Sequence, residues 1–171
     1  MTNHLIILAG GASSRMKKPS LSKLSEDLID QANSRSKALI LLNNRPMLDY
    51  VLYNAQQAGF QNIYIVIGNE GELFKTYYGK ERTKNQFHGL LISYVYQRIP
   101  EGRIKPFGTA DAVCQSLEQY PKLQGDEFVV CNCDNLYSEK AFNLLRTNKS
   151  PNAFISYDRD ALEYPQERIE K

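Results

Sequence analysis

Apolar positions along the chain follow two different periods. Short runs that are apolar at nearly every position are typical of strands buried on both faces of a parallel sheet. Apolar residues that recur every three or four positions are typical of one buried face of a helix. The continuous runs predict strands at residues 4–8, 62–67, 90–96, 127–131 and 153–157. The helical spacing predicts helices near residues 47–58, 70–79, 109–120 and 138–146, caps included.

The ends of these helices carry matching boundary residues. Pro46 suits the first turn of a helix and Gly59 its C-terminal stop. Thr109 and Ser138 are residue types that cap helix N-termini. The alternation of strands and helices predicts an α/β protein with a mostly parallel sheet and helices on both faces. Ligands of such sheets gather at the carboxyl ends of the strands.

The 171 residues are enough for one domain, and their composition is that of an ordinary globular protein. The 21 basic and 19 acidic side chains give a net charge of +2, which favours neither nucleic acid nor a membrane surface as a partner. No apolar run approaches the ~20 residues of a membrane span, and residues 5–9 are too short for a secretion signal. We therefore expect a cytoplasmic protein.

The three cysteines fit a reducing compartment. Cys131 and Cys133 are two apart on a predicted strand and share one face, and Cys114 lies in a helical pattern. A metal site would need further ligands at suitable spacing, and His4 and His88 are remote in sequence. Reduced, packed cysteines are therefore expected.

Two long polar stretches have no predicted place in the core. Residues 17–36 are rich in Ser and Lys, which predicts a loop or a poorly anchored helix. After residue 157 the chain is mostly charged, and no apolar run follows. We expect residues 1–171 to be a single domain that is incomplete at its C-terminus.

A glycine-rich segment directly follows the first predicted strand. Gly10 and Gly11 let the main chain approach an anion closely, and successive N–H groups can form an anion-binding concavity. Arg15 adds a fork of donors that matches phosphate oxygens. The segment is neither a Walker A loop, which needs Gly-Lys-Ser or Gly-Lys-Thr, nor the Gly-x-Gly-x-x-Gly dinucleotide motif. The spacing predicts a phosphate loop of another class.

Three further segments have side chains suited to phosphate chemistry. Lys37 immediately precedes an apolar run over residues 38–42, so that it can emerge from a strand end beside the glycine loop and neutralise phosphate charge. Gly108 and Thr109 open a helix whose free N–H groups favour anions, with room for a flat base. Asp134 follows a buried strand and can hold Mg²⁺, which takes one or two carboxylates together with substrate phosphates. Asp111 suits the first helical turn, and we assign it no catalytic role.

Together these segments resemble the sugar-phosphate nucleotidyltransferases of the nucleoside-triphosphate transferase family, from about residue 5 to about residue 136. The signature loop, the lysine segment and the metal segment are similar to Leu8-Ala9-Gly10-Gly11 with Ser14-Arg15-Met16, Ser36-Lys37-Ala38-Leu39, and Cys133-Asp134-Asn135-Leu136-Tyr137. The nucleotide-site motif is matched by Gly108-Thr109-Ala110-Asp111-Ala112-Val113, especially as found in glucose-1-phosphate adenylyltransferases. Gln97-Arg98 is similar to the segment whose glutamine helps to read the base.

The resemblance implies a Rossmann-like fold of the nucleotide-diphospho-sugar transferase type and transfer of a nucleoside monophosphate from a nucleoside triphosphate to a sugar 1-phosphate. It implies Arg15 for the pyrophosphate, Lys37 for the α-phosphate or the incoming phosphate, and Asp134 for magnesium. The implied nucleotide-binding residues are Ala9, Gly10, Gly11, Ser14, Gln97, Gly108 and Thr109. A homo-oligomer is compatible with the sequence, which defines neither the base, the sugar nor the assembly.

The chain departs from the family pattern in several places. The segment between Arg15 and Lys37 is longer than usual, which leaves Lys18 as a rival for the lysine role, and Cys133 replaces a common glycine. The spacing from Gln97 to Gly108 is also long. The second metal-binding aspartate and the acceptor-sugar contacts expected in a later segment are not recognisable after residue 157. A non-sugar phosphorylated acceptor and a non-catalytic nucleotide-binding regulatory domain stay as alternatives, whereas the missing dinucleotide motif disfavours a dehydrogenase fragment.

Overall fold

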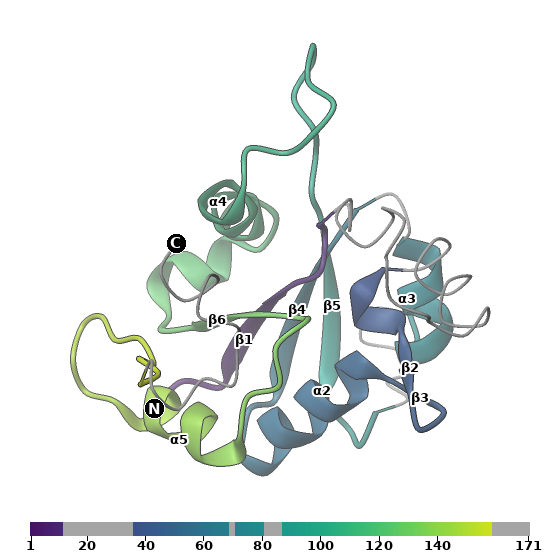
Figure 1. Ribbon diagram of the computed structural model, residues 1–171. Coiled ribbons are helices and arrows are strands. Elements are labelled where there is room, and N and C mark those ends of the chain that lie inside the picture. The colour runs from purple at the N-terminus through teal and green to yellow at the C-terminus, as the bar shows by residue number, and fades with distance from the viewer. Residues whose placement is uncertain (12–35, 69–70, 81–86, 159–171) are drawn as a thin grey trace.

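A four-stranded parallel sheet forms the centre of the molecule (Figure 1). The computed structural model describes residues 1–11, 36–68, 71–80 and 87–158; the predicted loop or weak helix at 17–36 lies outside them except for its last residue. The strands are β1 (His4–Leu8), β4 (Asn62–Ile67), β5 (Leu91–Tyr96) and β6 (Val129–Asn132), in the order β5-β4-β1-β6. β1 is thus an inner strand. The chain adds β4 and β5 on one side of it and then β6 on the other.

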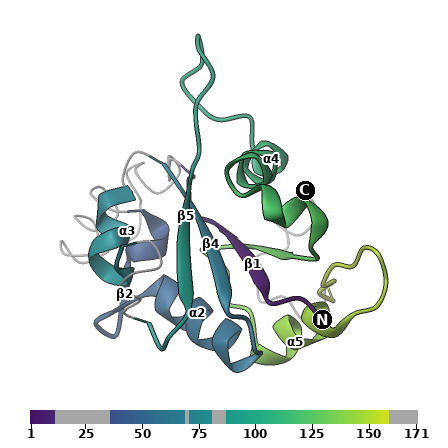
Figure 2. The ribbon, with the colours of Figure 1, turned by 180° about the vertical axis from the view of Figure 1, so that it is seen from behind.

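Alternate side chains of the strands enter two separate cores. Leu5 and Ile7 face one side of the sheet, and Ile6 faces the other. The first side is covered by η1 (Lys37–Leu39), α2 (Met47–Gln57), α3 (Gly71–Tyr78) and α5 (Glu139–Thr147). The second is covered by α4 (Thr109–Gln119) and η2 (Pro121–Gly125) (Figures 1 and 2). The predicted α/β class, with helices on both faces of a parallel sheet, is confirmed.

The helix boundaries follow the predicted residues, with two changes of detail. The side chain of Ser138 accepts a hydrogen bond from the Ala141 N–H, as expected of a cap. Gly59 ends α2 with a φ of +93°, which glycine adopts readily. Pro46, however, precedes the first turn of α2 as its N-cap. Thr109 is the first residue of α4, and the cap position belongs to Gly108.

One of the five expected strands is wrong. Residues 153–157 contain no strand; their side chains are largely exposed, and Phe154 is 85% exposed. The apolar run after Lys37 is a 3₁₀ turn followed by a two-residue strand, β2 (Leu41–Leu42). β2 pairs with β3 (Arg45–Pro46) across a turn whose two asparagines have positive φ. An apolar run cannot by itself report whether a neighbouring strand is available to pair with it.

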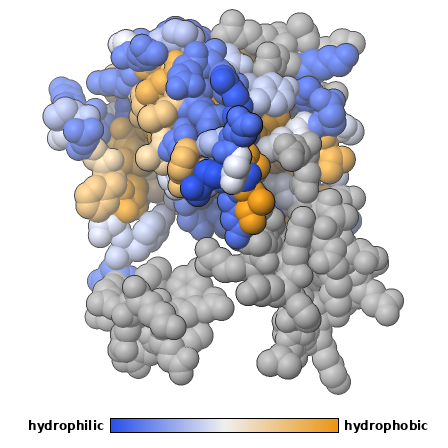
Figure 3. Space-filling model, turned by 90° about the horizontal axis from the view of Figure 1, so that it is seen from above, coloured by the Kyte–Doolittle hydropathy of each residue, from blue (hydrophilic) through white to orange (hydrophobic). Residues whose placement is uncertain are grey.

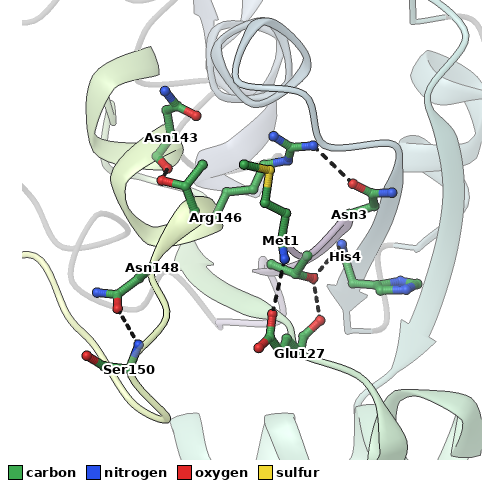
Figure 4. A network of polar contacts seen from close by, with 10 residues as sticks. Met1, Asn3, His4, Glu127, Asn143, Arg146, Asn148 and Ser150 are labelled. Carbon is green, nitrogen blue, oxygen red and sulfur yellow. Dashed lines mark hydrogen bonds and ion pairs between the residues drawn. The ribbon is translucent and has the colours of Figure 1, made fainter.

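The amino-terminal edge of the sheet is held by a network of polar contacts (Figure 4). The Met1 ammonium lies 3.7 Å from a carboxylate oxygen of Glu127, and the Thr2 hydroxyl donates to the Glu127 carbonyl. Arg146 on α5 donates to the Asn3 side chain at 3.2 Å, and its carbonyl accepts from the Thr2 N–H. These contacts attach the N-terminus to α5 and to the segment that leads into β6.

Among the described residues, no helix combines the length and apolar character needed to cross a bilayer.

Residues 97–108 form an arm between β5 and α4 that projects beyond the carboxyl ends of the strands (Figure 1). Ile104 is 91% exposed and Phe107 63% exposed, and the Arg103 guanidinium lies 4.3 Å from the centre of the Phe107 ring. Viewed from this end, the described residues are mainly hydrophilic, and most of the hydrophobic ones lie toward one side (Figure 3). The base of the arm, at Gln97 and Gly108, belongs to a cleft described next.

Candidate active site

A cleft of about 380 Å³ opens at the carboxyl ends of β1, β4 and β6. Parallel sheets bind ligands at this edge, next to the point where the strand order reverses. Segments far apart in the sequence contribute to its wall. The lining residues are Leu8, Ala9, Gly10, Gly11, Ser36, Lys37, Val66, Gln97, Pro106, Gly108, Thr109, Ala112, Asn132, Cys133 and Asp134.

The glycine loop continues β1 directly into the cleft. The Ala9 N–H donates to the Val66 carbonyl at 2.9 Å, which keeps the loop aligned with β4. The side chain of Gln97 lies against Gly10, so that a Cβ at Gly10 would be only 2.6 Å from the Gln97 Oε1. The Gln97 N–H donates to the Ile67 carbonyl, which places the start of the arm beside the loop. Gly10 is therefore required for the close approach of the glutamine amide.

Lys37 and Asp134 meet in the cleft. The Lys37 Nζ lies 3.1 Å from the Asp134 Oδ2, although 97 residues separate them in sequence. Lys37 belongs to η1, and Asp134 to the turn after β6. The Cys133 N–H donates to the Leu8 carbonyl and so attaches that turn to the end of β1. Both side chains are partly exposed (33% and 40%), so that a bound phosphate could reach either.

The N-terminus of α4 forms another wall of the cleft. Gly108, with a φ of +129°, bends the chain from the arm into the helix, and Thr109 follows it. Asp111 accepts a hydrogen bond from the side chain of Gln115, which also bonds to the main chain of Arg98. Asp111 is not among the residues that line the cleft, which agrees with the structural role expected for it.

Eight of the ten residues predicted for the site lie in this one cleft: Ala9, Gly10, Gly11, Lys37, Gln97, Gly108, Thr109 and Asp134. The other two, Ser14 and Arg15, and the rival Lys18, lie outside the described residues. The expected convergence of the glycine loop, the lysine, the helix start and the aspartate at one edge of the sheet is found. Their individual chemical roles stay predictions.

Some lining residues were missed by the sequence analysis. Asn132 is the last residue of β6 and presents an exposed side chain between two buried cysteines, a position that strand alternation could have indicated. Ser36 and Pro106 also line the cleft. They come from a polar segment and from the arm, where no periodic pattern marks the residues that face inward.

The cysteines are free, as expected; Cys131 and Cys133 are packed in the core, whereas Cys114 is exposed on α4, contrary to the expected packing. Burial, with a smaller effect of the Asp134 charge, raises the pKa of the Cys133 thiol to about 12. Burial also raises the pKa of Cys131 well above its ordinary value. Burial therefore favours the neutral thiol over the thiolate at both positions.

Solved structures of UDP-glucose pyrophosphorylases share this fold. One of them, complexed with UDP-glucose, matches with a TM-score of 0.61 and 17% identity, covering 86% of this chain and 53% of the other. The enzyme from Acinetobacter baumannii matches with a TM-score of 0.57 and 16% identity, over 78% and 46% of the two chains. These likenesses establish the nucleotide-diphospho-sugar transferase type of fold.

Curated relatives are similar in sequence over about three-quarters of the chain. The D-glycero-alpha-D-manno-heptose 1-phosphate guanylyltransferase of Aneurinibacillus thermoaerophilus is 26% identical over 132 residues, which are 77% of this chain and 46% of the relative. The bifunctional protein GlmU of Staphylococcus epidermidis is 30% identical over 131 residues, 77% of this chain and 22% of the relative. The chain thus spans less than half the length of these relatives.

A family model covers nearly the whole chain. The model is that of the MobA-like NTP transferase domain, and it matches residues 5–163. This range includes the glycine loop, η1, the start of α4 and the turn after β6, which line much of the cleft. The chain therefore belongs to the MobA-like NTP transferase family.

Proposed function

We propose that this chain is a nucleotidyltransferase that moves a nucleoside monophosphate from a nucleoside triphosphate to a sugar 1-phosphate and releases pyrophosphate. The observation that carries the proposal is the 3.1 Å contact between Lys37 and Asp134 in the cleft beside the glycine loop. A cation for phosphate and an anion for a metal ion are thus available within one small volume. A cytoplasmic location, where nucleoside triphosphates are available, is part of the proposal.

The choice of a sugar phosphate as acceptor has two supports. The segment Gly108-Thr109-Ala110-Asp111-Ala112-Val113 resembles that of sugar-phosphate enzymes, and the first two of these residues line the cleft. A relative at 26% identity is a guanylyltransferase acting on a heptose 1-phosphate. We therefore propose a sugar 1-phosphate as the acceptor, rather than another phosphorylated compound.

The proposed reaction needs little covalent help from the protein. An oxygen of the sugar phosphate forms a bond to the α-phosphorus, and the bond from that phosphorus to the bridging oxygen of the β-phosphate breaks. Pyrophosphate leaves with the electron pair, and no proton has to move. Catalysis of such a step depends on in-line positioning and on stabilisation of the phosphate charge.

The described residues can supply both the positioning of the substrates and the stabilisation of the phosphate charge. The main chain at Gly10 and Gly11 lets the triphosphate approach closely, and the first turn of α4 offers free N–H groups at Thr109. Lys37 neutralises charge on the α-phosphate or on the incoming phosphate. Gln97, which lies beside Gly10, is proposed to contact the base. Arg15, outside the described residues, is proposed for the leaving pyrophosphate on the family resemblance alone.

Asp134 fits a magnesium ion that relies on its substrate for most ligands. Among the described lining residues it is the one carboxylate, and it is 40% exposed. No cluster of three or more His, Cys, Asp or Glu that could enclose a metal occurs among the described residues. Mg²⁺ commonly takes one or two carboxylates and completes its shell with water and phosphate oxygens. When bound, the ion supplies charge neutralisation at the phosphates.

The direct test is pyrophosphate release, measured for each common nucleoside triphosphate with a set of sugar 1-phosphates that includes glucose 1-phosphate and the heptose 1-phosphate, with Mg²⁺. We expect turnover with at least one pair. Calorimetry with the same triphosphates accompanies the assay. Binding without any turnover would replace the proposal by a nucleotide-binding regulatory domain.

The metal assignment has its own test, the variant Asp134→Ala. We expect it to lose magnesium-dependent turnover and to keep the melting temperature of the parent, because an exposed ion pair contributes at most about 1 kcal/mol. The matched control is Asp126→Ala, which removes an exposed carboxylate at the opposite edge of the sheet. Equal rates of pyrophosphate release in the parent and in Asp134→Ala would remove the metal assignment.

A further inference from the structure

One phenol group joins the two sides of the turn that carries Asp134. The hydroxyl oxygen of Tyr137 accepts a hydrogen bond from the Asn132 main-chain N–H at 3.2 Å. It accepts a second from the Asn135 side-chain amide, also at 3.2 Å. Asn132 precedes Asp134 and Asn135 follows it, so that the two bonds close the turn around the aspartate.

Tyr137 is itself firmly attached to the core. Its ring packs against Phe142 of α5, with 5.5 Å between the ring centres, and against the larger hydrophobic cluster. Its carbonyl accepts a hydrogen bond of 2.8 Å from the Asn54 side chain of α2. The next residue, Ser138, caps α5. Tyr137 is therefore attached to α5 through its ring and to α2 through its carbonyl.

The aspartate needs such support. Its side chain is 40% exposed, and its carboxylate contacts the flexible ammonium group of Lys37. A half-exposed carboxylate is oriented mainly by the main chain that carries it. That main chain is held on one side by the bond from the Cys133 N–H to the Leu8 carbonyl. The Tyr137 hydroxyl adds one bond to the main chain of Asn132, before the aspartate, and one to the side chain of Asn135, after it.

We infer that Tyr137 is a positioning residue, which orients the Asp134 carboxylate toward a divalent cation through its hydrogen bonds to Asn132 and Asn135. This inference rests on the proposed function of Asp134 and adds a residue to it. Groups that orient a metal ligand without touching the metal are as a rule worth about 10- to 100-fold in metal affinity or activity.

The test uses Tyr137→Phe, which removes the hydroxyl and keeps the ring in the core. The matched control is Tyr120→Phe, which removes a phenol hydroxyl that donates to the Tyr94 carbonyl at 3.0 Å, away from the cleft. Pyrophosphate release is measured over a range of Mg²⁺ concentrations with saturating substrates. We expect the Mg²⁺ concentration for half-maximal activity to rise roughly tenfold or more in Tyr137→Phe and to stay unchanged in Tyr120→Phe.

A merely structural role of the hydroxyl would lower the melting temperature of both variants and leave their Mg²⁺ dependence alone. That outcome would overturn the inference. Asn135→Ala removes one of the two donors without touching the aromatic core, so that it keeps the test valid if Tyr137→Phe does not fold. It should shift the Mg²⁺ dependence in the same direction by a smaller factor, and no shift would count against the inference.

The parallel variant Asp134→Ala separates this inference from the proposed function. Loss of turnover in Asp134→Ala with parental Mg²⁺ dependence in Tyr137→Phe would refute the positioning role alone. Parental turnover in Asp134→Ala would refute the role of the aspartate, and the positioning role with it. In a Tyr137→Phe/Asp134→Ala double variant, the tyrosine change should have no further effect on residual activity, because the two act as one unit.

Discussion

Replacement of Gly10 by alanine tests whether the glutamine amide beside the glycine loop takes part in nucleotide binding. Gly10 has no positive φ, so that its main chain accepts an L-residue without strain. Its Cβ would lie 2.6 Å from the Gln97 Oε1, far below ordinary contact, whereas the Gln97 Cβ and Cδ would remain at 3.6 Å. The substitution therefore displaces one functional group and leaves the rest of that side chain in place.

The magnitude follows from the distance. The Gln97 Oε1 has to retreat by about 0.8 Å, from 2.6 Å to the 3.4 Å at which ordinary contact begins. A misplacement of about 1 Å at a reacting site can cost about 10²-fold in rate, or roughly 2.7 kcal/mol of transition-state stabilisation. The fold should lose little, because Gly→Ala stabilises by about 0.4–1 kcal/mol through the unfolded chain and an off-rotamer glutamine costs a similar amount.

Initial-rate kinetics of pyrophosphate release and thermal melting measure the two effects. We expect kcat/KM of Gly10→Ala to fall by as much as about 10²-fold, with a free energy of unfolding within about 1 kcal/mol of the parent. Gly125→Ala is the matched control, because a Cβ there meets no atom within 4 Å and lies far from the cleft. In a Gln97→Ala background the alanine at position 10 has no amide to displace, so that its effect should vanish.

The double-mutant cycle shows whether Gly10→Ala acts through the Gln97 amide. Strictly additive losses from Gly10→Ala and Gln97→Ala would mean that the alanine acts by some route other than the amide. Parental kcat/KM for every substrate pair in Gly10→Ala would refute the role of Gln97 in the site.

Three further predictions concern the cleft and the opposite edge. A Cβ at Gly11 meets no protein atom within 4 Å, so that Gly11→Ala should raise the KM for the triphosphate and leave the melting temperature unchanged, as kinetics and calorimetry can check. Lys37→Met should lower kcat/KM by about 10²-fold or more and hardly change the melting temperature, because its exposed pair with Asp134 contributes at most about 1 kcal/mol. Burial lowers the pKa of His4 below its ordinary 6.5, with Asp126 partly opposing this. The folded state therefore binds that proton less tightly than the unfolded chain, and stability should be complete above pH 6.5 and decline as the pH falls through it toward the lower pKa. Urea unfolding from about pH 7.5 to about pH 5 should show this decline in the parent and less of it in His4→Asn.

Much of the fold was predictable because local pattern and burial agree. The strands at residues 4–8 and 62–67 are bounded as predicted, since both are buried on two faces and read as continuous apolar runs. The strand predicted at 153–157 failed because pairing depends on a neighbouring strand, which no local pattern reports. The order β5-β4-β1-β6 could not be read from the chain either, because it is set by which connections cross which face.

The candidate site was predictable as a location and less so as a set of contacts. The rule that parallel strands present their carboxyl ends at one edge placed the glycine loop and Asp134 together. The approach of Lys37 to Asp134 depends on how η1 packs against α2, a tertiary property. The arrangement of Tyr137 was not foreseen, because a tyrosine after a polar turn has no signature that separates packing from positioning.

The polar network at the amino-terminal edge and the cleft lie at opposite ends of the same strands. The five residues of β1 put about 17 Å between them, farther than substitutions without shared partners usually communicate. Substitutions at one end can therefore change stability, and substitutions at the other end can change the proposed activity, independently of each other. Replacements around Met1, Glu127 and Arg146 could strengthen the protein without altering its chemistry, and any loss of stability incurred by redesigning the cleft for a new substrate could be recovered at the far end of the sheet.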